Sequence, residues 1–191
     1  MNMVGHPKHV QKAIDVGCDL ICAQAGEGGG HTGDTPASIL IPACVDACKG
    51  KFSKLNGKPI YVVGAGAVYD GRGLAANLSW GAQAVCKLQL FPREFKFSRS
   101  FPHYLGVGTR FVASVEAGAP KLHKELVVSA GFEDAVTTLI YTGRPLRVRK
   151  TPYVADWEAN RQAEIKELTA KGVIPHYNEL EKYPNKSLEG R

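Results

Sequence analysis

The feature of this sequence that most constrains its fold is a repeated order of apolar strand, glycine-rich turn and helix. Residues 19–24 form a short apolar run, residues 25–34 hold five glycines, and a helical pattern follows. Residues 60–63 are again continuously apolar and again lead into a glycine turn. Continuously apolar strands are typical of buried parallel sheets, and parallel strands joined by helices form right-handed units. The sequence therefore predicts an α/β fold.

Prolines, glycines and polar caps predict where the helices begin and end. Pro7 suits the first turn of a helix that Gly17 ends, and Asp70 can cap a helix that continues to about Trp80. The other expected segments are a helix at 39–48, strands at 82–85 and 107–112, a helix at 120–130, one helix capped by Asp156 and ended by Gly172, and little order in 173–191.

The charge of the chain is positive, which raises the question of nucleic-acid binding. The net charge is +6, and residues 86–106 alone carry four basic side chains and one acidic one. A second basic cluster, residues 144–150, alternates with apolar residues as a strand or a crossing segment would. No recognition-module pattern accompanies either cluster. We therefore expect solvated basic faces and no nucleic-acid partner.

Cysteine usage and hydropathy bear on compartment and metal binding. The five cysteines are an odd number, and no signal-peptide pattern opens the chain. Cys18 and Cys22, placed on a strand, would lie about 13 Å apart, too far to share one zinc ion. No apolar run approaches the length of a membrane helix. We expect reduced, structural cysteines, no metal site, no membrane span and an intracellular, cytoplasmic location.

The glycine turns carry the first functional signal. Backbone N–H groups in such a turn, with a helix start behind them, can bind an anion, and two such turns suggest a phosphate-bearing cofactor. The second turn, Gly64-x-Gly66, departs from the dinucleotide fingerprint because Tyr69 stands where a small residue is needed. Plain turn geometry is the alternative for either turn. His31, just past a strand end, is a candidate for proton transfer.

Several segments of the chain match the motifs of one enzyme family. Residues 22–33, with Gln24, the glycine run and His31, closely resemble the A-Q-G-x-E-[AG]-G-G-H-x-G loop of nitronate monooxygenases, also called 2-nitropropane dioxygenases. The other matching segments are residues 62–76 with A-A-G-G-I-x-D-G-R-G-L-A-A, residues 107–111 with G-T-R-F, and residues 141–145 and 152–153 with the fungal-type branch. The resemblance concerns the C-terminal half of that family.

The resemblance implies a fold, a cofactor and a reaction. The fold would be a partial (β/α)8 TIM barrel, formed by its C-terminal strand–helix units, with a helical C-terminal extension. The enzymes bind FMN and oxidise alkyl nitronates with O2, giving carbonyl compounds and nitrite. By motif position, His31 would be the catalytic base. The residues implied to bind the cofactor are Gln24, Gly29, Gly66, Gly108 and Thr109.

The resemblance also implies a domain layout. Residues 1–155 would form the FMN-binding barrel domain, interrupted by an atypical insertion at 86–106, and residues 156–191 a terminal helix and tail. Two alternatives stay open. One keeps the fold and the flavin in an NAD(P)H:quinone or enoyl-thioester reductase, and the other is an inactive truncated fragment. The physiological substrate and the oligomeric state are left open.

Overall fold

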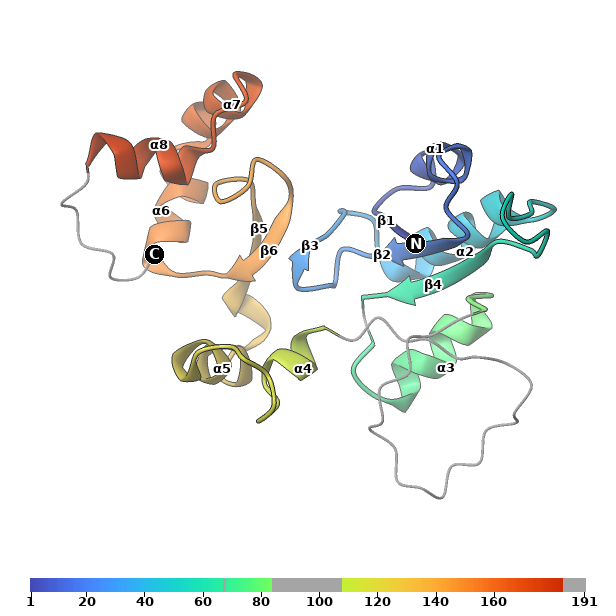
Figure 1. Ribbon diagram of the computed structural model, residues 1–191. Helices are drawn as coiled ribbons and strands as arrows, with labels where there is room; N and C mark the ends of the chain where they lie inside the picture. The colour runs from blue at the N-terminus through green and yellow to red at the C-terminus, as the bar shows by residue number, and fades with distance from the viewer. Residues whose placement is uncertain (67, 84–107, 184–191) are drawn as a thin grey trace. The chain divides into compact units, whose positions relative to one another are not determined.

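The computed structural model in Figure 1 describes residues 1–66, 68–83 and 108–183. The insertion predicted at 86–106 lies outside the described residues. The chain divides into two compact units. Unit 1 comprises Met1–Gly28 and Thr32–Phe111, and unit 2 comprises Gly29–His31 and Val112–Arg191.

Unit 1 is built on a three-stranded parallel sheet in the order β1-β2-β4 (Figure 1). A helix follows each strand, so the sheet is assembled from consecutive strand–helix units and the α/β class is confirmed. The elements are β1 (Asn2–Val4), α1 (His9–Asp15), β2 (Leu20–Gln24), α2 (Ala37–Cys48), β4 (Tyr61–Ala65) and α3 (Gly71–Ser79), with α4 (Thr109–Val112) at the boundary with unit 2.

The core of unit 1 lies between the sheet and helices α1 and α2. Ile21 and Val62, on the neighbouring strands β2 and β4, pack with Leu40 of α2 in one cluster of buried side chains. Each such side chain stabilises the fold by about 1.5–3 kcal/mol when fully buried. Cys44 and Cys48 are free thiols on the buried face of α2. Burial raises the pKa of Cys44 to about 12, so this thiol stays protonated at neutral pH.

Two sequence predictions in unit 1 need correction. The strand expected at 107–112 is wrong, since residues 109–112 form the short helix α4. In that conformation the Phe111 N–H donates to the Gly108 carbonyl over 2.9 Å, which satisfies within the segment a donor that a strand would have to pair elsewhere. Of the strand expected at 82–85, residues 84–85 lie outside the described part. Gln83 is not in a strand, although its N–H donates to the Val62 carbonyl over 3.2 Å.

Unit 2 contains a small antiparallel sheet and a group of helices. The sheet order is β3-β6-β5, so β6 pairs on both sides. The elements are β3 (Gly30–His31), α5 (Lys121–Val128), the 3-10 helix η1 (Phe132–Asp134), β5 (Ala135–Thr138), β6 (Leu146–Arg149), α6 (Pro152–Asn160), α7 (Gln162–Ala170) and α8 (Pro175–Lys182). The sequence leaves the basic alternating segment open between a strand and a crossing segment, and its residues 146–149 form the strand β6.

The C-terminal helices differ from the sequence prediction. Instead of one helix capped by Asp156 there are two, α6 and α7, and the Thr151 hydroxyl caps the first by accepting from the Val154 N–H over 3.3 Å. The expectation of little order beyond residue 173 is wrong for α8. The predicted boundary after residue 155 falls inside α6, and this division into domains stays a prediction.

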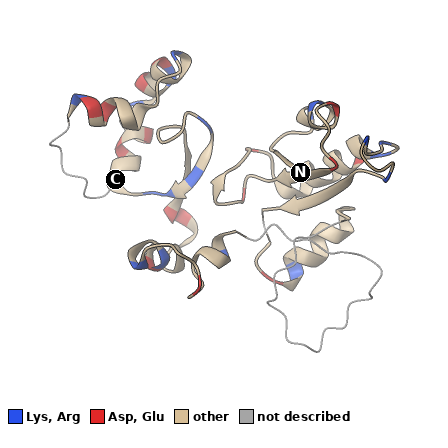
Figure 2. Cartoon of the chain, in the orientation of Figure 1, with Lys and Arg blue, Asp and Glu red and all other residues tan. Residues whose placement is uncertain are grey.

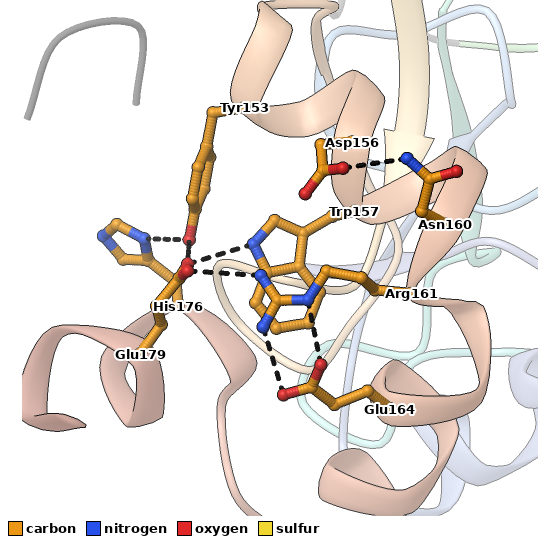
Figure 3. A network of polar contacts seen from close by, with 8 residues as sticks. All are labelled: Tyr153, Asp156, Trp157, Asn160, Arg161, Glu164, His176 and Glu179. Atoms are coloured by element: carbon orange, nitrogen blue, oxygen red, sulfur yellow. Dashed lines mark hydrogen bonds and ion pairs between the residues drawn. The ribbon is translucent and has the colours of Figure 1, made fainter. Parts of the chain in front are cut away.

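A buried carboxylate explains why α8 is ordered (Figure 3). Glu179 is only 3% exposed, yet Tyr153 Oη and Trp157 Nε1 donate to its Oε2 over 2.7 and 3.2 Å. Arg161 donates to its Oε1 over 3.2 Å and stacks on the Trp157 ring, with 3.3 Å between the guanidinium carbon and the ring centroid. Because these partners come from α6 and its C-terminal end, the carboxylate ties α8 to α6.

Figure 2 shows charged residues of both signs along several helices, and Arg147 and Arg149 add positive charge to β6. Several form exposed pairs along one helix, such as Lys171 with Glu167 at 2.6 Å. Within residues 1–66, 68–83 and 108–183, no helix is long and apolar enough to cross a membrane. The same residues hold no cluster of three or more His, Cys, Asp or Glu side chains placed to bind a metal ion.

Candidate active site

The turns that follow β2 and β4 meet at the carboxyl ends of these two strands in unit 1. Gln24 and Ala65 are paired in register, and the Ala25 N–H donates to the Ala65 carbonyl over 2.8 Å. Gly66 then turns with φ +92°, a conformation that favours glycine. A Cβ atom there would lie 3.1 Å from both the Cβ and the carbonyl oxygen of Ala25. The close approach of the two turns therefore depends on glycine at position 66.

The Gln24 side chain lies across the first glycine turn. A Cβ atom on Gly28 would lie 2.0 Å from Gln24 Nε2, so the amide occupies the space that a side chain at position 28 would fill. The Gly28 N–H donates to the Ala25 carbonyl over 3.0 Å. Gly66 is buried, and its N–H makes no hydrogen bond with the part of the chain that the structure describes. A buried unpaired N–H in a glycine turn suits an anionic ligand.

The helix ends behind the two turns are already occupied by carboxylates. Both Glu27 carboxylate oxygens accept from the Ala37 N–H, each over 3.1 Å, at the start of α2. Asp70 accepts from the Arg72 and Gly73 N–H groups over 3.0 and 3.2 Å at the start of α3. The cap predicted for Asp70 is thus confirmed. The expected contribution of positive helix ends to anion binding is used within the protein, which leaves the amides of the turns themselves.

The turn after β1 joins the same edge of the sheet. A Cβ atom on Gly33 would lie 2.8 Å from the Cα atom of Gly5, the residue that follows β1. The Thr32 hydroxyl donates to the Ala25 carbonyl and thereby holds the end of the glycine-rich loop over β2. All three parallel strands therefore end in tightly packed backbone, at the edge where α/β proteins place their ligands.

Gly108 and Thr109, predicted to complete the phosphate site, lie at the start of α4. Both residues are exposed, and a Cβ atom on Gly108 would meet nothing within 4 Å. Arg110 donates from Nη1 to the Tyr69 carbonyl over 3.2 Å. Because Tyr69 is in the loop after β4, this bond links α4 to the segment that contains Gly66.

His31 lies in unit 2, on the two-residue strand β3. It is exposed, and its backbone pairs with Leu146 of β6. Its Nε2 lies 3.1 Å from the Thr142 hydroxyl oxygen. Sequence reasoning did not assign Thr142 a role, although the residue stands in the segment 141–145 that carries part of the family resemblance. Gly29, predicted to lie against the cofactor, is exposed and directly precedes β3.

The predicted site residues thus fall into two groups. Unit 1 brings the turns of Gln24 and Gly66 together and contains Gly108 and Thr109, whereas Gly29 and His31 belong to unit 2. The convergence of all six residues on one ligand stays a prediction.

Comparison with known proteins finds relatives among nitronate monooxygenases and carboxyl-CoA dehydrogenases. The family model that matches residues 1–87 is described as nitronate monooxygenase, and the resemblance found in the sequence is confirmed. A hydroxy-methyl-oxo-octahydro-indene-carboxyl-CoA dehydrogenase of Mycobacterium tuberculosis is 34% identical over 160 residues, which cover 84% of this chain and 38% of that protein. A nitronate monooxygenase of Neurospora crassa is 32% identical over 161 residues, 75% of this chain and 36% of that protein.

Among solved structures, FabK from Thermotoga maritima has a TM-score of 0.61 at 25% identity and covers 91% of this chain and 50% of its own. A nitroalkane oxidase from Streptomyces ansochromogenes has a TM-score of 0.59 at 23% identity, with 91% and 49% covered, and shows a shared fold. The chain spans half or less of the length of each of these four proteins.

Proposed function

We propose that this chain, whose residues 1–87 belong to the nitronate monooxygenase family, is part of an FMN-dependent oxidoreductase that oxidises alkyl nitronates with O2. The products would be carbonyl compounds and nitrite. The observation that carries the proposal is the meeting of the glycine turns after β2 and β4, inside the segment that matches the family. A small-molecule substrate and O2 would be the partners of the reaction.

The proposed architecture is a partial (β/α)8 barrel over residues 1–155, with 156–191 as a helical extension. Two facts support it: β1, β2 and β4 are parallel in chain order with a helix after each strand, and the likeness to FabK covers 91% of the chain. Such a barrel needs eight parallel strands. The described residues contribute three of them, so the activity is proposed for a protein in which the other strands are also present.

The residues of unit 1, together with Gly29 of unit 2, support the proposed binding of FMN. The unpaired Gly66 N–H would donate to the phosphate, together with Gly108 and Thr109, and the Gln24 amide would contact the flavin ring beside Gly29. Since carboxylates cap α2 and α3, the phosphate would be bound by the Gly66 turn and the start of the short helix α4 rather than by the starts of α2 and α3. When bound, FMN accepts electrons from the substrate and passes them to O2.

His31 would act as the catalytic base that deprotonates or positions the substrate. Its imidazole is exposed on β3, and the Thr142 hydroxyl lies within hydrogen-bond distance of one ring nitrogen. A neutral imidazole can take up a proton near neutral pH. The pairing of β3 with β6 fixes the backbone that carries this side chain.

A second candidate function is the NAD(P)H-dependent reduction of an enoyl thioester, such as a coenzyme A thioester. The relatives from Mycobacterium tuberculosis and Rhodococcus jostii, each 34% identical, are both named as carboxyl-CoA dehydrogenases. This candidate keeps the fold, the flavin and the role of the glycine turns, and replaces the nitronate by a thioester with a nicotinamide as the electron donor.

Anaerobic reduction of the flavin separates the candidates. The full chain is loaded with FMN and mixed either with an alkyl nitronate or with NAD(P)H. Bleaching by the nitronate supports the proposed function, bleaching by NAD(P)H supports the thioester alternative, and a flavin that neither reagent reduces supports an inactive fragment. The variant H31Q serves as the control, because it should bind FMN and lose bleaching by a neutral nitroalkane, which must first give up a proton to the base.

A further inference from the structure

We infer that Thr142 fixes His31 in the tautomer that carries its proton on Nε2, so that Nδ1 is the nitrogen that accepts the substrate proton. The inference rests on the proposed role of His31 as the base and adds which atom acts and which residue orients it. In this account Thr142 is a positioning residue.

Backbone pairing brings Thr142 to the imidazole from a distant part of the chain. His31 and Thr142 are 111 positions apart, and β3 and β6 pair antiparallel with His31 opposite Leu146. Thr142 lies in the turn before β6, where the Gly143 N–H donates to the Leu139 carbonyl over 2.8 Å. The two side chains are therefore held by one sheet and its adjoining turn, all within unit 2.

The hydrogen bonds of the Thr142 hydroxyl decide the tautomer. Besides His31 Nε2 at 3.1 Å, the hydroxyl oxygen lies 3.3 Å from the Arg144 nitrogen and 3.2 Å from the Arg144 carbonyl oxygen. A hydroxyl group has one hydrogen to donate and can accept two. The Arg144 N–H can only donate and the Arg144 carbonyl can only accept.

One assignment pairs all of these groups. The hydroxyl donates to the Arg144 carbonyl and accepts from both the Arg144 N–H and the His31 Nε2–H. In the opposite assignment the hydroxyl donates to Nε2, the Arg144 carbonyl loses this partner, and the imidazole proton sits on Nδ1. In that state the basic lone pair lies on Nε2 and already accepts from the Thr142 hydroxyl, so it would be less available to a substrate proton than a free Nδ1.

The first assignment leaves a base that is ready to react. Among the described residues none makes a hydrogen bond to His31 Nδ1. When a C–H acid such as a nitroalkane reacts, the C–H bond breaks, its electron pair stays on the substrate as the nitronate, and the proton bonds to Nδ1. The Nε2–H keeps donating to Thr142 before and after this transfer, so the ring keeps its orientation.

The tautomer is measured by two-bond 1H–15N correlation spectra of the full chain labelled with 15N-histidine, at a pH above the titration range of imidazole. The His31 signal is identified by its loss in H31Q. We expect a protonated-type shift at Nε2 and an unprotonated-type shift at Nδ1. T142V should move both shifts toward the average of the two tautomers and lower kcat about 10- to 100-fold, whereas T142S should restore the spectrum and most of kcat.

The outcomes separate this inference from the proposed function. If H31Q oxidises a neutral nitroalkane as the wild type does, the role of His31 as the base fails, whatever the tautomer. If His31 is essential but its spectrum shows the proton on Nδ1, or if T142V leaves the spectrum unchanged, the inference about Thr142 is overturned and the proposed function stands.

Discussion

The predicted site residues are divided between two units, and these units are built in opposite ways. In unit 1 the sheet is parallel and follows the chain order, so each glycine turn is placed by the strand just before it and the helix just after it. In unit 2 the strand that contains His31 pairs with β6. The side chain that contacts the His31 imidazole belongs to Thr142, which is 111 positions away in the sequence. Local structure therefore places the turns proposed to bind the cofactor, whereas long-range pairing sets the orientation of the proposed base.

The largest effect is expected in unit 2, from Glu179. The variant E179A removes the buried carboxylate that accepts from Tyr153, Trp157 and Arg161, and should cost roughly 3 kcal/mol in the free energy of unfolding of this unit. Hydrogen exchange should show loss of protection in α8. The exposed glutamate of the same helix provides the control, E181A, which should change little. Protection of α8 that survives in E179A would contradict the role given to this carboxylate.

In unit 1, the next largest effect should come from Gly64 in β4. A Cβ atom there would lie 2.0 Å from Asn77 Oδ1 and 3.3 Å from Ile41 Cδ1, so G64A should destabilise the unit by about 1–3 kcal/mol. Asn77 is fully buried, and its Oδ1 has no hydrogen-bond partner among the described residues. Urea unfolding of G64A/N77A should therefore recover part of the loss. If the loss in free energy of unfolding of the double variant equals or exceeds the sum of the losses in G64A and N77A, Asn77 is not what a side chain at position 64 meets.

A matched pair of glycines then isolates the contact between the turns. Gly66 and Gly17 have nearly the same φ, +92° and +91°, but only Gly66 is crowded by Ala25 and Gly28. Both G66A and G17A should lose about 1 kcal/mol in the free energy of unfolding because alanine strains the backbone at positive φ. G66A should lose about 1 kcal/mol more because its Cβ atom is crowded by the neighbouring turn. Thermal unfolding measures the difference. Equal losses would mean that the two turns do not press on each other.

The smallest effect concerns pH and the core of unit 1. The Cys44 thiol has a pKa raised from 9.0 to about 12, first by burial and then by the neighbouring Cys48. Below pH 9 the thiol is protonated in both states, and above it the unfolded chain ionises first, so stability should fall as pH rises from about 9 to 12. Urea unfolding at pH 8 and pH 10 should show a smaller difference for C44A than for the wild type. Equal differences would argue against burial of this thiol.

Much of unit 1 could be predicted from the sequence because its signals are local. The apolar runs became β2 and β4, the helices α2 and α3 lie where the pattern places them, and Asp70 caps α3. The short strand β1 was not predicted. The end of the chain misled the prediction because the order of α8 depends on Glu179, whose partners lie on or next to α6 and give no pattern within residues 173–191.

The candidate site also combines features with local sequence signals and features that depend on contacts between distant residues. The glycine turns and His31 could be recognised from residue types and spacing, together with the family resemblance. Carboxylates occupy the starts of α2 and α3, so the N–H groups there are not free to bind an anion. For α2 the carboxylate is that of Glu27, ten positions before the Ala37 N–H that it accepts from, and this contact could not be predicted from the sequence. The contact between His31 and Thr142 depends on the β3–β6 pairing, which no local signal encodes.

The binding of FMN by the turns after β2 and β4 is tested by the visible absorbance of the full chain after incubation with FMN and gel filtration. We expect a yellow protein for the wild type and for G17A, and a colourless one for G66A, because only position 66 lies where the turns meet. A colourless wild type, or a G66A variant that retains as much flavin as the wild type, would contradict it.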